Sequence, residues 1–372
     1  MKRLFLLTIL VVLSLCGFGQ NVLTTPHGPA CGTDPMNQQL HQHKPHVLQF
    51  QQLLERTWYR QQISGQGSVS RQLYTIPTVV HIIHNGGSAN IANQQVMQAI
   101  DAMNDALRNR GAFDPATGVD VEIELCLAVQ DTNGNLTNGI TRSLSPLTDF
   151  TMETQDLQMK ALARWDPTRY LNIYVVNSVT SLSSGPGVAG YAFFPGAHGS
   201  PEDGIVGEVA YFTGSAGDIS VFVHEAGHYL GLYHTFQGNC GNNDCLQDGD
   251  RVCDTPPDGS TRVVPCSGSV NTCTTDEDDT STNNPFRATS LGGLGDQNDM
   301  HINYMDYGDP NCYSAFSSGQ KTRMVLSLTS ARASLLQSNG CQTPCQQPIT
   351  ASFSIAGLPT AVGGSITLNA NT

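Results

Sequence analysis

The stretch HEAGHYLGLYH, residues 224–234, contains three histidines, one glutamate and two glycines. In a helix, positions i and i+4 lie on the same face, so His224 and His228 can both reach one metal ion. Gly231 permits a sharp change of direction that brings His234 back as a third ligand. Three imidazoles leave a fourth tetrahedral position open, which is typical of a catalytic zinc site rather than a structural one.

Glu225 lies one step round the helix from the first histidine, close enough to hold a metal-bound water. Zinc lowers the pKa of such a water to about 7 and polarises a carbonyl oxygen. Glu225 would take the proton and pass it to the leaving amine, so the pattern predicts a zinc metalloendopeptidase. Two alternatives stay open: a secreted binding or adhesion module on an inactive metallopeptidase scaffold, and a zinc amidase of non-protein substrates.

Composition indicates a loop-rich extracellular protein. The chain has 372 residues, of which 39% are hydrophobic and only 13% are charged, and it contains 37 glycines. That length is enough for one large core plus additional segments. The net charge of −13 and the lack of Lys/Arg clusters argue against a nucleic-acid partner, since phosphate binding requires such clusters.

The N-terminus has the pattern of a secretory signal. Lys2 and Arg3 precede an apolar run over residues 4–15, and small residues follow. The run is shorter than the ~20 residues that a membrane span needs. We therefore predict a signal peptide over residues 1–19, a secreted protein and no membrane span.

Residues 20–71 form a predicted prosegment. The segment 46–62 has a helical pattern, with Val47, Phe50, Leu53 and Leu54 on one face. It leads into SGQGSVSRQ, whose composition is typical of a flexible, cleavable linker.

Strand and helix patterns then alternate, which predicts an α/β fold with a mixed sheet. The histidine helix should begin at Asp218 or Ser220. From 238 to about 286 almost no periodicity remains, so disulfides or bound cations must hold this part together. The expected elements are strands at 74–85, 119–130 and 170–178, and helices at 93–111, 154–165 and 318–337.

Eight of the eleven cysteines lie between Cys240 and Cys345, whereas Cys31 and Cys126 stand apart. A dense, even set in a secreted chain predicts disulfides. The pairs in CGNNDC and CQTPC leave a structural zinc site as the alternative.

The histidine string is the long zinc-binding signature of the metzincins. Together with GDRVCDTPP, NYMDYG and NCY, it resembles the pappalysin family over about residues 74–337. The resemblance implies a metzincin-like fold with an active-site helix in an N-terminal subdomain and a loop-rich C-terminal subdomain, within a catalytic domain at 72–340. It also implies a tight turn beneath the zinc at Met305, and a hydrogen bond from Tyr307 to the oxyanion.

The resemblance further implies how substrate is bound. GVAGYAFFPG at 187–196 matches an edge strand that aligns an extended substrate through Gly190, Tyr191 and Ala192. Arg-specific relatives have an acidic residue where this chain has Asn311, so we expect a weaker or broader preference for Arg and Lys. Protein or peptide substrates and a monomeric enzyme are expected.

A calcium site and a disulfide pattern are also implied by the resemblance. Asp250 and Thr255 would supply oxygen ligands to Ca²⁺. The implied bridges are Cys240–Cys273 and Cys266–Cys312, and the remaining cysteines would pair as Cys245–Cys253 and Cys341–Cys345.

Cys31 lies in ACGT, a form found in prosegments of this family, where a thiolate occupies the fourth zinc position. The chain's own prosegment is therefore the expected inhibitor of a latent precursor. At the other end, 341–372 resembles a linker and the start of an immunoglobulin-like domain of the polycystic-kidney-disease type.

Overall fold

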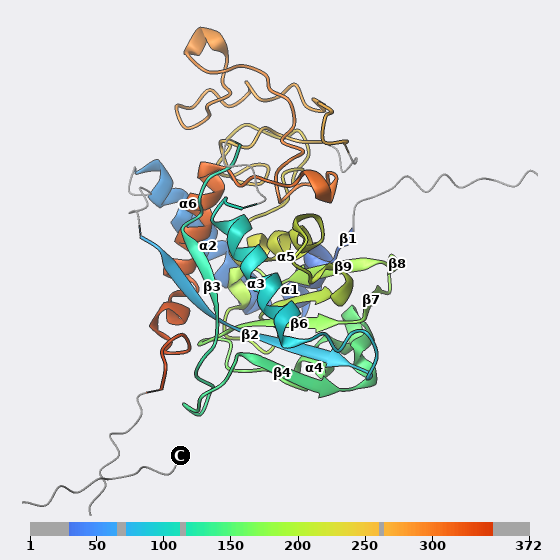
Figure 1. Cartoon of the computed structure of the whole chain (residues 1–372). Helices are drawn as coiled ribbons and strands as arrows, with labels where there is room; N and C mark the ends of the chain where they lie inside the picture. The colour runs from blue at the N-terminus through green and yellow to red at the C-terminus, as the bar shows by residue number, and fades with distance from the viewer. Residues whose placement is uncertain (1–29, 65–71, 112–116, 260–263, 345–372) are drawn as a thin grey trace, which may run out of the picture.

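The computed structural model describes residues 30–64, 72–111, 117–259 and 264–344 (Figure 1). The predicted signal peptide and the C-terminal immunoglobulin-like segment lie outside the described residues.

A seven-stranded mixed sheet forms the centre of the fold, in the order β1-β9-β10-β6-β2-β3, with β4 paired to the second half of β2. All neighbouring strands are parallel except β9 and β10. The mixed α/β class predicted from the sequence is confirmed. The strands are β1 Ala30–Cys31, β2 Tyr74–His84, β3 Ile123–Leu127, β4 Ile140–Leu144, β6 Leu171–Val176, β9 Val188–Ala192 and β10 Ile205–Glu208. A second, three-stranded sheet contains β5 Asp149–Thr151, β7 Ser178–Ser181 and β8 Gly185–Pro186.

The sheet has a hydrophobic core on each face because its central strands are apolar on both sides. All six residues of β6 are buried. On one face, Ile173 packs with the helices α3 (Asn93–Leu107) and α5 (Ala216–Tyr229). On the other face, Tyr174 packs with α1 (Thr33–His43) and α4 (Met152–Lys160). The histidine helix α5 begins at Ala216, two residues before the earlier of the predicted starts.

Helix α2 (Pro45–Ile63), in the predicted prosegment, lies beside α6 (Ser318–Ser330), as Figure 1 shows. Its predicted apolar face is partly wrong, because Phe50 and Leu53 are 41% and 51% exposed. Gln51 and Trp58 are buried instead. The surface that α2 covers presents hydrogen-bonding groups and an arginine, which an amide and an indole can satisfy and an aliphatic face cannot.

The predicted C-terminal helix is interrupted after Ser330 and resumes as a short 3₁₀ helix. Between α5 and α6, the described residues contain only 3₁₀ turns as helical structure, in agreement with the predicted loop-rich region. The 3₁₀ helices are η1 Pro146–Thr148, η2 Pro195–Ala197, η3 Val209–Tyr211, η4 Thr289–Leu291, η5 Pro310–Cys312 and η6 Ala333–Gln337.

Four disulfides cross-link the described part of the chain. Three of them are the pairs stated above: Cys240–Cys273, Cys245–Cys253 and Cys266–Cys312. The Cys341–Cys345 pairing is wrong, because Cys341 bonds to Cys126 on β3. After η6 the chain returns to the sheet, where Val129 N–H donates to Gly340 O, and this brings the two cysteines together. Cys345 lies outside the described residues.

The Cys126–Cys341 bridge closes a sequence separation of 215 residues, so it should contribute strongly to stability. The double substitution Cys126→Ser/Cys341→Ser should lower the free energy of unfolding by about 2–5 kcal/mol, measured by denaturant titration. The pair Cys245→Ser/Cys253→Ser is the control, because it opens a separation of only 8 and should cost less. Equal losses for both pairs would contradict the loop-entropy explanation.

Candidate active site

The three histidines of residues 224–234 converge in the interior at the end of α5. Nε2 of His228 lies 3.0 Å from Nε2 of His224 and 3.1 Å from Nε2 of His234. The Nδ1 atoms of His224 and His228 bond to the carbonyls of Tyr304 and Leu232, at 2.6 and 2.8 Å. A hydrogen bond at Nδ1 places the proton there and leaves the Nε2 lone pair free for a metal ion. Burial lowers the pKa of His224 to about 3, which keeps it neutral, as a ligand must be.

Two glycines in the motif make this geometry possible. Gly231 has φ +94°, a conformation that other residues rarely adopt, and the reversal there returns the chain toward the helix. A Cβ at Gly227 would collide with the sulfur of Met305, which is fully buried. Met305 N–H donates to Asn303 Oδ1 and its carbonyl accepts from Thr235 N–H, so the predicted turn packs directly beneath the histidines.

Glu225 is buried between α5 and the edge strand β9. A Cβ on Gly190 would lie only 3.1 Å from Glu225 Cγ, so the glycine permits this close packing. Burial raises the pKa of Glu225 to about 8, and hydrogen bonds from Cys31 and Thr33 oppose that rise. A carboxyl group with a raised pKa is suited to exchange protons near neutral pH.

Residues 30–33 lie along the outer edge of β9 and cover the histidines. Cys31 pairs with Gly190 in parallel register, and Gly32 N–H donates to Gly190 O at 2.8 Å. The sulfur of Cys31 and one nitrogen of each histidine all lie within 4.8 Å of one another. The structure therefore brings the predicted switch cysteine to the three predicted ligands.

Thr33 contacts the candidate catalytic base, which the sequence interpretation missed. Its hydroxyl donates to Glu225 Oε2 at 2.8 Å and accepts from Ala192 N–H at the same distance. Asp34 places Oδ2 3.2 Å from Nδ1 of His234. Residues 31–34 thus contact the candidate base and one histidine as well as offering a thiol. The position of Thr33, two residues after Cys31 in ACGT, was the only feature of the sequence that pointed to this contact.

Tyr307 completes the wall of the site. Its ring centroid lies 5.1 Å from that of His234, and its hydroxyl accepts the backbone N–H of Cys31 at 3.2 Å. Burial raises the pKa of this phenol, so the hydroxyl remains protonated and able to donate.

The remaining predicted residues lie away from the histidines. Asp250 and Thr255 are buried and bonded to each other, Thr255 Oγ1 donating to Asp250 Oδ2 at 2.7 Å. Burial raises the pKa of Asp250 to about 7. Asn311 lies at the other end of α5, against Gly217, and its amide donates to Asp309. The side chain of Tyr191 points away from the cleft and donates to Asp156, so only its backbone borders the site.

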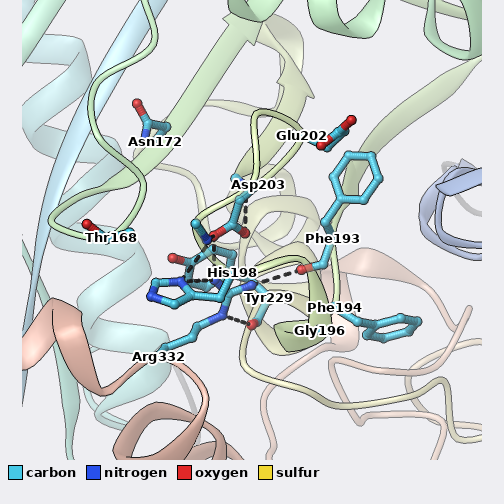
Figure 2. Close-up of polar contacts among 12 residues, drawn as sticks. Thr168, Asn172, Phe193, Phe194, Gly196, His198, Glu202, Asp203, Tyr229 and Arg332 are labelled. Carbon is cyan, nitrogen blue, oxygen red and sulfur yellow. Dashed lines mark hydrogen bonds and ion pairs between the residues drawn. The ribbon is translucent and has the colours of Figure 1, made fainter. Parts of the chain in front are cut away.

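Arg332 holds the edge strand and the histidine helix together, as Figure 2 shows. Its guanidinium donates to the carbonyls of Tyr229 at the end of α5 and Phe193 just after β9, at 2.7 and 3.1 Å. It also pairs with the buried carboxylate of Asp203 at 2.8 Å and contacts His198 at 3.1 Å. Arg332 therefore sets the spacing between the two walls of the cleft. Nothing local in the sequence pointed to this role.

Converging imidazoles, a buried carboxylate beside them and an adjacent strand whose outer edge is covered by residues 30–33 define a metallopeptidase. Residues 153–329 match the peptidase family model described as Pregnancy-associated plasma protein-A. The matched stretch contains the histidine motif and is similar to this family, the pappalysins.

Relatives and solved structures agree with this assignment. An extracellular metalloprotease of Pyricularia oryzae is 29% identical over 280 residues, covering 73% of this chain and 80% of that protein. One from Colletotrichum graminicola is 34% identical over 198 residues, covering 50% and 59%. Among the described residues, no helix combines the length and apolar character that a membrane span requires.

A promirolysin mutant of Tannerella forsythia matches with a TM-score of 0.60 and 28% identity, covering 83% of this chain and 97% of that chain. Mature mirolysin of the same organism, in complex with a cleaved peptide, matches with a TM-score of 0.57 and 27% identity, covering 74% and 99%.

The Arg332–Asp203 pair should be essential for stability because both side chains are at most 1% exposed. Arg332→Met removes the guanidinium from the buried carboxylate of Asp203, which keeps only its contacts with His198 and two backbone N–H groups among the described residues, and should cost about 3–5 kcal/mol of unfolding free energy. Denaturant titration on an inactive Glu225→Ala background, which prevents self-digestion, measures this cost. The double substitution Arg332→Met/Asp203→Leu should recover much of the loss, and a cost below about 1 kcal/mol for Arg332→Met would contradict the role.

Proposed function

We propose that this chain is a secreted zinc endopeptidase made as a latent precursor, with Glu225 as the general base. The observation that carries the proposal is the buried Glu225 carboxylate beside three converging Nε2 atoms, next to strand β9. The names of the extracellular relatives support secretion, for which residues 1–19 are the proposed signal.

The donor set fits zinc. His224, His228 and His234 supply imidazole nitrogens, and the carbonyl partners of two Nδ1 atoms fix the orientations of the His224 and His228 rings. When bound there, zinc supplies a Lewis acid that polarises the substrate carbonyl and acidifies water. Glu225 takes the proton from the attacking water and delivers it to the leaving amine. Tyr307 donates its hydroxyl proton in a hydrogen bond to the developing oxyanion.

The substrate would lie along β9, through the backbone of Gly190, Tyr191 and Ala192. In the latent chain these groups already bind another segment, since Gly190 O accepts from Gly32 N–H and Ala192 N–H donates to Thr33. An edge strand with such groups recognises any extended peptide, and its side-chain pockets add selectivity. Asn311 is neutral and its amide donates to the carboxylate of Asp309, which supports a broad preference rather than a strict one for arginine.

We assign latency to residues 20–71 and catalysis to 72–340. Cys31 would supply a thiolate to the zinc, while Thr33 binds the base and blocks water from it. The similarity to promirolysin supports a removable prosegment.

A structural calcium ion at Asp250 and Thr255 is part of the proposal. A buried carboxylate whose pKa is raised by burial gains from a nearby cation, and oxygen ligands suit Ca²⁺. Peptide substrates and a monomeric enzyme complete the proposal.

Replacing the base tests the activity directly. Glu225→Gln in the processed protein should lower kcat/KM for an unfolded protein substrate by at least about 10²-fold, because it removes proton transfer and keeps the shape of the side chain. A chelator should abolish the wild-type activity, and added zinc should restore it. Chelator-resistant cleavage, or equal cleavage by the variant, would rule out the endopeptidase.

Latency should depend on the thiol and on Thr33 separately. The precursor with Cys31→Ala should cleave peptides before processing, because water can then reach the metal site. Thr33→Val removes the hydrogen bonds to Glu225 and Ala192 with little change of shape, so it should leave the precursor partly active. The control is Thr57→Val, because the hydroxyl of Thr57 bonds only within α2. Full latency of the Cys31→Ala precursor would contradict the switch.

A further inference from the structure

Glu55 of the proposed prosegment helix α2 is the carboxylate of a buried charge cluster that shares no residue with the metal site. Its Oε1 accepts from Arg323 at 2.6 Å and from the Tyr233 hydroxyl at 3.0 Å, and its Oε2 pairs with Arg251 at 3.0 Å. The Glu55 side chain is only 10% exposed. Two guanidinium groups and a phenol thus converge on one carboxylate.

The three groups that receive Glu55 all belong to the part of the chain that remains after the prosegment is removed. Both guanidinium groups lie over the ring of Tyr233, with Cζ of Arg323 at 5.0 Å and Cζ of Arg251 at 5.3 Å from the ring centroid. Arg251 has φ +62°, a strained conformation for an arginine, which the loop maintains at this position. These contacts orient the cluster independently of Glu55.

No other carboxylate pairs directly with Arg251 or Arg323 among the described residues. Asp250 is near Arg323, but its two oxygens already accept from Thr255 and from Val252 N–H. The other buried arginine of this region, Arg332, keeps its own partner Asp203. Removal of α2 therefore leaves a charged cluster that has lost its anion.

The cluster lies next to the metal site. Tyr233 directly precedes His234, and the ring of Phe194 lies 5.0 Å from Tyr233 and 5.7 Å from His228. Arg323 also donates through Nε to Gly231 O at 2.7 Å, at the reversal of the histidine motif. A polypeptide in the cleft could therefore reach both places.

We propose that Arg251, Arg323 and Tyr233 form a carboxylate-binding exosite of the mature enzyme, which takes an acidic side chain of a polypeptide substrate. The inference rests on the proposed endopeptidase with a removable prosegment. In the precursor, Glu55 occupies this exosite as a mimic of the substrate group.

The electrostatics of Glu55 agree with a binding site for an anion. Burial by itself raises the pKa of this carboxyl, but the charges and hydrogen bonds of Arg323 and Arg251 outweigh burial and lower it below its usual value. The cluster therefore favours the ionised form of its occupant. Hydrogen bonds between charged partners of this kind change affinity by about tenfold or more.

The first experiment measures binding without catalysis. Glu225→Ala protein, cut in its linker by an added protease and freed of the prosegment, is titrated with a labelled peptide of residues 45–63. The same peptide with Glu55→Gln should bind about tenfold more weakly. Arg251→Gln in the protein should weaken the wild-type peptide similarly and add little to the peptide variant, as a double-mutant cycle requires.

The second experiment measures substrate choice in the active processed enzyme. Pairs of peptides that differ only by Glu or Gln are compared at each position flanking the cleaved bond. At one position, Glu should raise kcat/KM by about tenfold over Gln, and Arg251→Gln should remove that ratio. Arg169→Gln is the matched control, since Arg169 is also half-buried and stacks on a tyrosine, Tyr170, at 5.4 Å.

Each outcome decides the proposal. A Glu/Gln ratio that depends on Arg251 and not on Arg169 supports the exosite. Equal binding of the two α2 peptides, or Glu55-dependent binding without any Glu/Gln ratio in substrates, overturns it. If no peptide is hydrolysed, the endopeptidase proposal fails, while the binding measurement still reports on the carboxylate site.

Discussion

The site depends on one constraint, which is that the chain must reverse immediately after α5 inside the protein. A helix that ends in the interior leaves its last carbonyl groups without partners, and burying them unpaired is costly. Here Arg332 and Arg323 donate to the carbonyls of Tyr229 and Gly231. Buried cations at a helix C-terminus also interact favourably with its dipole. The convergence of the three imidazoles therefore rests on two arginines that are distant in sequence and bind no metal themselves.

Each arginine then requires an anion, and the two anions come from different parts of the chain. Asp203 follows the edge strand and remains with the catalytic unit, whereas Glu55 belongs to the prosegment helix. Strand β9 likewise belongs to the catalytic unit but takes its partner from the proposed prosegment, because its outer edge pairs with residues 30 and 31. At both places, a residue of the proposed prosegment satisfies a group that would lose this partner if the segment were removed. Binding of the prosegment and binding of a substrate are thus alternative solutions to one requirement.

Local pattern predicted most of the fold and the convergence of the three histidines, and long-range contacts account for what it missed. The spacing of His224 and His228 places both side chains on one helix face, and Gly231 permits the reversal that follows. Because these effects act within a few residues, the sequence alone predicted them. The Cys126–Cys341 bridge joins positions 215 residues apart, and no spacing rule reaches that far. The face of α2 was misjudged because its buried side chains match a surface whose arginine and backbone groups were unknown from the sequence.

Two separate polar attachments join the proposed prosegment to the rest of the chain, in addition to the apolar packing of Met36, Leu40 and Val47. Contacts at Thr33 and at Glu55 act on one segment, so each raises the effective concentration of the other. Cutting the linker after residue 64 alters neither contact, but it makes both of them bimolecular with respect to the catalytic unit. In the intact chain, Trp58 is fully buried and its indole N–H donates to the Ser330 hydroxyl. Release should therefore follow from breaking α1 or α2 rather than from the linker cut itself, because only that separates the two attachments.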